Sequence, residues 1–417
     1  MSAVGRSAEV CAAVEDGRVL ELEQAVLRIP SPVFEEHDLA DYLAERMTGM
    51  GLDVRMMDVT HPGRPGQKTR QPIGLLRGTG GGPTLMLNGH MDPAFMMSGW
   101  TVDPHGGHFA DGWVWGAGAH DDKGGVVAAL SALDAIQRAG TRLKGDVLMC
   151  CVAAHKAGGV GTRVLLQEGV RADACINMEH SANTIATTIT GSVRIGLTTR
   201  STGLFFRYTP EAKAAYWNAI EQQGEIMRRL GPSLDPADPA TSWMDFAPHP
   251  DLPGFPLHRF DRIGKEHYLR DCKMVMQVRT VPGQTAAGIA AETQRVLDGI
   301  KADFPAFDCE MTVPEGGADD PFIAEPSEIA KNHPLVVALA EGQRRASGRE
   351  PEVGGVLRVG NYGDGNILAA AGIPSLQYGP GDVRIYPEWP APDERVELRE
   401  LVEASRAIAH AVLAYCG

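Results

Sequence analysis

Short apolar segments typical of strands alternate along the chain with longer segments whose apolar residues recur every three or four positions. Helical spacing covers residues 13–51, and a second helix pattern, rich in small residues, covers 123–140. Apolar strand patterns cover 83–90, 145–155 and 174–180. Strands that alternate with helices predict an α/β layer with a largely parallel sheet.

The pattern changes near Ser192. Two strand patterns and two helix patterns follow, at 192–201, 272–282, 210–230 and 285–304. A Pro-rich segment, 231–259, predicts a long ordered loop, and α/β character resumes from about residue 316. We therefore predict one α/β domain formed by 1–192 plus 315–417, interrupted by a smaller α+β domain at 193–314.

The composition of the chain limits the classes of partner that the protein can bind. The chain is 43% hydrophobic, and its 39 Lys and Arg against 53 Asp and Glu give a net charge of −14. Bulk charge of this sign disfavours nucleic acid and anionic membranes, so an anionic ligand would need a local basic pocket. No segment has the length of a membrane span, the start lacks a secretory pattern, and the seven Cys form no CxxC. We expect a cytoplasmic globular protein with reduced thiols.

Side chains that can bind a cation occur in three parts of the chain. Two parts are the ends of apolar strand patterns, and the third is a connection between two such patterns. His90 ends the strand pattern at 83–90 and Asp92 lies two residues further on. Asp121 precedes a Gly-Gly and a helix, and Glu179 ends the third strand pattern. A strand-end histidine satisfied by a nearby aspartate would give the same local pattern as a metal ligand. The three elements together, at one edge of an α/β sheet, predict a cation site.

The order of the motifs resembles that of one metallohydrolase family, which includes acetylornithine deacetylase, succinyl-diaminopimelate desuccinylase and glutamate carboxypeptidase. The motifs are LMLNGHMD, DPHGGHFADGWVWGAGAHDDKGG, AGGVGTRVLL, INMEH, VRTVPG and LAAAGIPSLQYGPGD. The resemblance implies a zinc-exopeptidase-like α/β catalytic domain with a mixed sheet, interrupted by an α+β lid through which the chain forms a homodimer or higher homo-oligomer. It also implies His90, Asp121 and Glu179 as ligands of the first metal, with Asp92 orienting His90.

The chain departs from the family where a second metal would bind. The family has two consecutive Glu, a general base and a second-metal ligand, where this chain has His155 and Lys156. Pro390 stands where the family has the other second-metal ligand, a His. A protonated ammonium and a proline cannot coordinate, so Lys156 would replace the charge of the lost ion. We predict one divalent ion, manganese before zinc, with His155 as general base and Lys156 receiving negative charge.

Several residues are candidates for binding a small anionic substrate. The family has a His in the inserted domain where this chain has Arg207, flanked by aromatic residues. Arg279 in VRTVPG is a second candidate, with a strand-end salt bridge as the alternative. Weaker candidates, and histidines near the site in sequence with no assigned role, are Asn361, Asp364, Arg384, His105, His108 and His120.

These substitutions favour an unusual C–N bond hydrolysis. Loss of the usual base and oxyanion donor, with cationic and aromatic residues in their place, suits the hydrolytic deamination of an anionic nitroaromatic amine, such as 5-nitroanthranilate to 5-nitrosalicylate and ammonia. One alternative is an amidohydrolase or carboxypeptidase acting on N-acyl amino acids or dipeptides. Another is an inactive scaffold or binding protein of the same fold, since loss of second-metal ligands is also what decay would produce.

Overall fold

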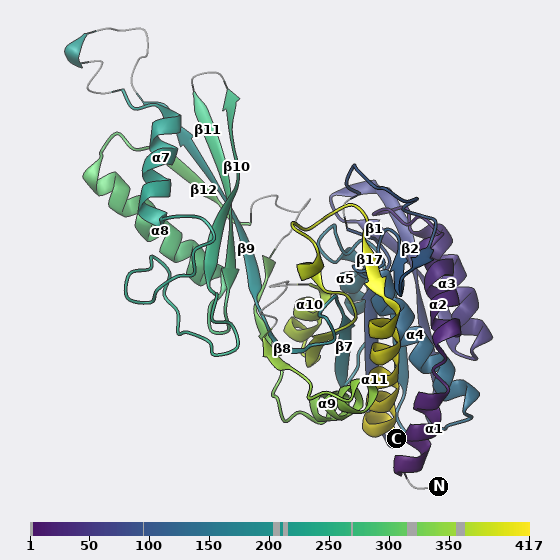
Figure 1. Cartoon of the computed structure of the whole chain (residues 1–417). Helices are drawn as coiled ribbons and strands as arrows, with labels where there is room; N and C mark the ends of the chain where they lie inside the picture. Colours follow the sequence, from purple (N-terminus) through teal and green to yellow (C-terminus); the bar gives the residue numbers. More distant parts are fainter. Residues whose placement is uncertain are drawn as a thin grey trace. The chain divides into compact units, whose positions relative to one another are not determined.

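The computed structural model describes residues 3–94, 96–202, 209–211, 216–267, 270–314, 323–355 and 363–417. The chain divides into two units (Figure 1). Unit 1 comprises Met1–Ile189 and Ser327–Gly417, and unit 2 comprises Thr190–Pro326. Sequence analysis placed the limits of the insertion at 193 and 314. None of the described helices is long and apolar enough to cross a bilayer.

Within the described part of unit 1, nine strands form one mixed sheet in the order β1-β2-β6-β3-β7-β16-β8-β14, with β15 paired to β8. The pairs β3–β6, β3–β7 and β7–β16 are parallel, whereas β1–β2 and β2–β6 are antiparallel. The strands are β1 (Asp53–His61), β2 (Arg64–Leu76), β3 (Leu85–His90), β6 (Val147–Val152), β7 (Ala174–Met178), β8 (Ile185–Ile189), β14 (Ser327–Glu328), β15 (Val353–Gly355) and β16 (Ser375–Tyr378). The predicted α/β class with a mixed sheet is confirmed.

Helices cover both faces of this sheet. They are α1 (Ala3–Ala12), α2 (Asp16–Leu27), α3 (His37–Gly49), α4 (Lys123–Arg138), α5 (Val160–Gln167), α9 (Pro334–Ser347), α10 (Asp364–Ala370) and α11 (Leu398–Cys416). Cys151 belongs to the core that includes α4, α9 and α11, whereas Cys150 belongs to the core that includes α5 and α10. Adjacent strand residues point to opposite faces, and helices cover both faces, so both cysteines are buried.

A second, small antiparallel sheet of unit 1 has the strand order β17-β5-β4. Its strands are β4 (His108–Ala110), β5 (Trp113–Trp115) and β17 (Arg395–Glu397). The Arg395 guanidinium lies 4.4 Å from the ring centroid of Trp115 and 5.3 Å from that of Trp113. These cation–π contacts tie the C-terminal segment to β5.

Unit 2 is an antiparallel sheet with two helices, α7 and α8, packed against it (Figure 1). Its described strands follow the order β10-β11-β9-β12, with β13 paired to β9. The elements are β9 (Gly191–Arg200), α7 (Ala219–Leu230), β10 (Leu257–His267), β11 (Asp271–Thr280), α8 (Ala286–Asp303), β12 (Cys309–Thr312) and β13 (Ile323–Ala324).

Two boundaries in unit 2 differ from the predicted ones. The predicted loop at 231–259 ends too late, because β10 begins at Leu257 and pairs with β11. Residues 261–265 of β10 are exposed, so this edge strand lacks the apolar alternation that reveals a half-buried strand. Residues 210–211 are helical as predicted, but residues 216–218 are not, and α7 begins at Ala219 after an Asn218 cap with Glu221 in a capping box.

Candidate metal centre

The site lies at the carboxyl edge of the parallel strands β3, β6 and β7. His90 is the last residue of β3 and pairs in register with Val152, the last residue of β6. The turn after β6 carries His155 and Lys156, and Glu179 directly follows β7. Parallel strands bring their carboxyl ends to one edge of a sheet, so side chains far apart in sequence meet there.

The backbone holds the His90 ring in a defined tautomer. Its Nδ1 lies 2.8 Å from the carbonyl oxygen of Asp92, and its Nε2 lies 3.0 Å from Asp121 Oδ1. A carbonyl oxygen can only accept, so Nδ1 carries a proton, and Nε2, which faces Asp121, is the nitrogen that a metal ion would bind.

Asp92 contacts His90 and also the turn after β6. Its carbonyl oxygen lies 2.8 Å from His90 Nδ1, and its carboxylate Oδ1 lies 3.8 Å from the same nitrogen. The carboxylate also accepts the backbone N–H groups of His155 at 3.0 Å and Lys156 at 2.8 Å. Asp92 therefore fixes the turn that carries the two substituted residues.

Asp121 and Lys156 form a buried ion pair at the centre of the site. Lys156 Nζ donates to Asp121 Oδ2 at 2.7 Å. Burial alone would raise the pKa of Asp121, but the ammonium and neighbouring imidazoles outweigh burial and hold that pKa well below its usual value. Burial likewise opposes the charge on Lys156, yet Asp121 and Glu179 raise its pKa. Both groups are therefore charged at neutral pH.

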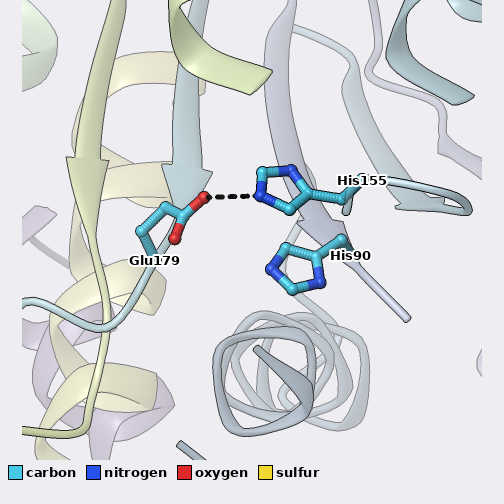
Figure 2. Close-up of side chains that lie close together, drawn as sticks. All are labelled: His90, His155 and Glu179. Atoms are coloured by element: carbon cyan, nitrogen blue, oxygen red, sulfur yellow. Dashed lines mark ion pairs between the residues drawn. The ribbon is translucent and has the colours of Figure 1, made fainter. Parts of the chain in front are cut away.

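His155 is held between two carboxylates. Its Nδ1 lies 3.0 Å from Asp364 Oδ2, at the start of α10, and its Nε2 lies 3.9 Å from Glu179 Oε1 (Figure 2). The ring stacks on that of His90, with centroids 4.1 Å apart and an interplanar angle of 4°. Burial lowers the pKa of His155, but Asp364 and Glu179 outweigh it and raise that pKa to about 9.

His180, to which sequence analysis gave no role, also reaches the site. Its side chain is buried, and Nδ1 lies 3.7 Å from Asp121 Oδ1 and 3.8 Å from Glu179 Oε2. The signal available in the sequence was an imidazole directly after the strand-end carboxylate. The ring contacts further rings, since its centroid lies 4.6 Å from that of His120 and 5.9 Å from that of Trp389.

Of the three histidines left without a role, His120 lies beside the site. Its ring is buried against Trp389 at 4.6 Å and Tyr386 at 5.6 Å between centroids. Burial, followed by the nearby His180, lowers its pKa well below the usual value, so the ring is neutral. His105 is partly buried and His108 is exposed in β4.

Glu394 holds the turn that presents Asp121. Its Oε1 accepts the backbone N–H groups of His120 and Asp121, both at 2.9 Å, and its Oε2 accepts that of Gly118 at 2.8 Å. Sequence analysis gave Glu394 no role. A buried carboxylate that accepts three backbone N–H groups is a rigid support for the metal-ligand candidate beside it.

The remaining substrate-binding candidates are Arg279, Arg384, Arg207 and Asn361. Arg279 belongs to unit 2, where its Nη2 donates to Thr190 Oγ1. Arg384 is half exposed and pairs with Asp382. Arg207 and Asn361 lie outside the described residues.

The side chains present fit a divalent cation. Two groups of three residues have ligand atoms within 4.8 Å of one another: His90, His155 and Glu179, and Asp121, Glu179 and His180. The buried Glu179 Oε1 accepts no hydrogen bond from the described residues. Imidazole nitrogens and carboxylate oxygens are ligands that zinc and manganese accept.

Comparisons with known proteins give one matching family and several relatives. The family model described as peptidase family M20/M25/M40 matches residues 86–414. The chain is 26% identical over 406 residues to N-formyl-4-amino-5-aminomethyl-2-methylpyrimidine deformylase of Bacillus subtilis, which covers 92% of this chain and 91% of that protein. It is also 26% identical to succinyl-diaminopimelate desuccinylase of Methylorubrum extorquens strain PA1, over 80% of this chain and 86% of that protein.

A solved structure shows the same fold. The aminopeptidase PepT from Bacillus cereus superposes with a TM-score of 0.76 at 14% sequence identity. The match covers 97% of this chain and 100% of that one.

Proposed function

Because the chain belongs to peptidase family M20/M25/M40, whose members are metal-dependent hydrolases of C–N amide bonds, we propose that it hydrolyses the amide bond of a small anionic N-acyl compound with one divalent ion. An N-acyl amino acid is the simplest substrate of this class. The names of the two relatives support the proposal, since a deformylase and a desuccinylase both remove an acyl group from nitrogen.

One observation carries the single-ion proposal. Lys156 Nζ lies 2.7 Å from Asp121 Oδ2, the oxygen that would otherwise be free for a second cation. A second divalent ion there would have to displace a buried ammonium whose pKa is raised by Asp121 and Glu179. Both zinc and manganese suit the mixed nitrogen and oxygen ligands, so we replace the predicted preference for manganese by these two candidates.

His155 and Lys156 supply the remaining chemistry. When bound, a divalent ion polarises the acyl carbonyl and lowers the pKa of water. Asp364 holds His155 Nδ1, so Nε2 is the atom that takes a proton from water and returns it to the leaving nitrogen. A divalent charge nearby would oppose the raised pKa of His155 and allow both steps. Lys156 stabilises negative charge that develops on the substrate.

The deamination of a nitroaromatic amine is a second candidate, and one observation favours it. The rings of His120, His180 and Trp389 form an aromatic group beside the metal-ligand candidates. Such rings suit a planar substrate. The relatives favour amide hydrolysis, because their names describe acyl removal from nitrogen.

The test separates the two reactions by product. Protein stripped of metal and reloaded with zinc or manganese is incubated with N-formyl, N-acetyl and N-succinyl amino acids, and with 5-nitroanthranilate. We expect a new primary amine from an N-acyl compound, one ion per chain, and no turnover by the His90→Ala variant. Ammonia from 5-nitroanthranilate without acyl removal would establish the second candidate, and two ions per chain would contradict the role given to Lys156.

A further inference from the structure

The two groups of candidate ligands share Glu179 and place a cation on different sides of it. One side carries His155, whose Nε2 lies 3.9 Å from Glu179 Oε1. The other carries His180, whose Nδ1 lies 3.8 Å from Glu179 Oε2. His90 belongs to the first group and Asp121 to the second, and His90 Nε2 and Asp121 Oδ1 lie 3.0 Å apart. The choice decides which histidine is a metal ligand.

Ring stacking argues against the side of His155. The rings of His90 and His155 are parallel within 4° and their centroids lie 4.1 Å apart. The lone pair of an imidazole nitrogen lies in the plane of its ring, so the lone pairs of two stacked rings do not converge. An ion at about 2.1 Å from a nitrogen of each ring would lie far out of both ring planes. Only one of the two stacked rings can therefore bind the ion.

The distances on the other side match a shared ion. Asp121 Oδ1 lies 3.0 Å from His90 Nε2 and 3.7 Å from His180 Nδ1. Ligand atoms at about 2.1 Å from one tetrahedral ion are about 3.4 Å apart, and the observed separations lie on both sides of that value. The His180 ring is also held in place, because it is buried and contacts the rings of His120 and Trp389.

The charged groups around the site also favour an ion on the side of His180. Lys156 Nζ occupies Asp121 Oδ2 and leaves Oδ1 for the ion. Glu179 Oε1 lies on the side of His155, whose Nδ1 contacts Asp364. Glu179 Oε2 lies on the side of His180. The two carboxylates and one divalent ion then balance in charge.

We propose that the single ion of the proposed hydrolase is bound by His90 Nε2, Asp121 Oδ1, Glu179 Oε2 and His180 Nδ1, and that His155 lies outside the coordination sphere. The assignment deepens the proposed function and depends on it for the identity of the reaction. It adds His180 to the ligands that the resemblance implies. It also leaves His155 free to move protons.

Metal affinity distinguishes the two histidines. Metal-free wild type, His180→Ala and His155→Ala are titrated with Zn²⁺ and with Mn²⁺ in competition with a chromophoric chelator. We expect His180→Ala to raise the dissociation constant by about 100-fold or more, because loss of even an indirect support of a ligand costs 10- to 100-fold. His155→Ala is expected to leave the constant unchanged or to lower it. The reverse order, or equal losses in both variants, would overturn the assignment.

A second measurement needs no His180 variant, in case that protein does not fold. Pulsed electron paramagnetic resonance of the Cu²⁺-substituted protein counts the imidazoles bound to the ion through their remote nitrogens. We expect two imidazoles in wild type and still two in His155→Ala, corresponding to His90 and His180. Loss of one imidazole in His155→Ala, or a count of one or three in wild type, would overturn it. Neither readout requires turnover, so failure of the proposed function would be seen separately.

Discussion

Lys156 lies at a position that in the resembled family holds a metal-ligating carboxylate, and its ammonium is 2.7 Å from Asp121 Oδ2. The pair is buried, and burial penalises both charges. An ion pair in such surroundings persists because each partner compensates the desolvation of the other. The proposed single-ion site therefore depends on this one side chain.

The first prediction concerns this ammonium. Lys156→Met keeps the apolar stem and removes the charge, which leaves Asp121 unpaired and removes the cation that stabilises the transition state. We expect kcat/KM to fall by about 10²–10³-fold and the free energy of unfolding to fall by roughly 3–5 kcal/mol. Steady-state kinetics and urea unfolding measure the two effects. Lys68→Met, at an exposed position of β2, is the matched control, and wild-type kinetics in Lys156→Met would refute the role.

Among the elements, the end of α2 and the start of α4 meet at a buried pair of ionisable groups. Lys123 Nζ donates to the carbonyl oxygens of Val26 at 3.3 Å and Ile29 at 2.8 Å, where the helix end carries partial negative charge. Burial raises the pKa of Glu23 to about 8 and lowers that of Lys123 to about 8. Neither carboxyl oxygen of Glu23 has a hydrogen-bond partner in the described part of the chain.

A pH dependence of stability follows from Glu23. Between its ordinary pKa of 4.5 and its folded pKa of about 8, the folded state holds a proton that the unfolded state has lost. Stability should therefore fall as pH rises through this window, whereas Lys123 adds an opposite slope only above about pH 8. Glu23→Gln should flatten the fall, by up to about 5 kcal/mol at 1.36 kcal/mol per pKa unit.

Urea unfolding of the metal-free protein at pH 5, 6, 7 and 8 measures this slope. Glu21→Gln, at an exposed position of the same helix, is the control and should keep the wild-type slope. An unchanged slope in Glu23→Gln would show that Glu23 is ionised in the folded protein.

For the whole molecule, the division into two units separates metal binding from the rest of the fold. All the candidate ligands described here belong to unit 1, whereas unit 2 has its own core beneath α7 and α8. A ligand stabilises only the folded unit that binds it. The consequences of metal removal should therefore be confined to one unit.

Hydrogen exchange of the full chain with and without metal tests this separation. At an ion concentration of 100 times the dissociation constant, we expect unit 1 to gain about 2.7 kcal/mol. Peptides that cover β3 and β7 should then exchange more slowly, while those that cover β11 should not change. His90→Ala should remove the difference, and equal protection of β11 and β3 by metal would contradict the prediction.

Prediction from the sequence succeeded where a signal was local. The apolar strand patterns that end at His90 and Glu179 gave the edge of the sheet, because strand periodicity and strand ends depend on neighbouring residues. Strand β10 was missed because its exposed edge residues, such as Ile263, follow no alternating pattern. The partners of Asp92, which are backbone N–H groups of a distant turn, have no sequence signature.

The sequence by itself determined the family resemblance, the α/β class and the substitution of His155 and Lys156, because these depend on residue type and order. Only the tertiary structure decided that Lys156 pairs with Asp121, that Asp364 holds His155 and that His180 reaches the same carboxylates. The reason is physical: an ion pair or a ligand set depends on distances of a few ångströms between groups brought together by the ends of separate strands, and those distances are set by the packing of the whole sheet.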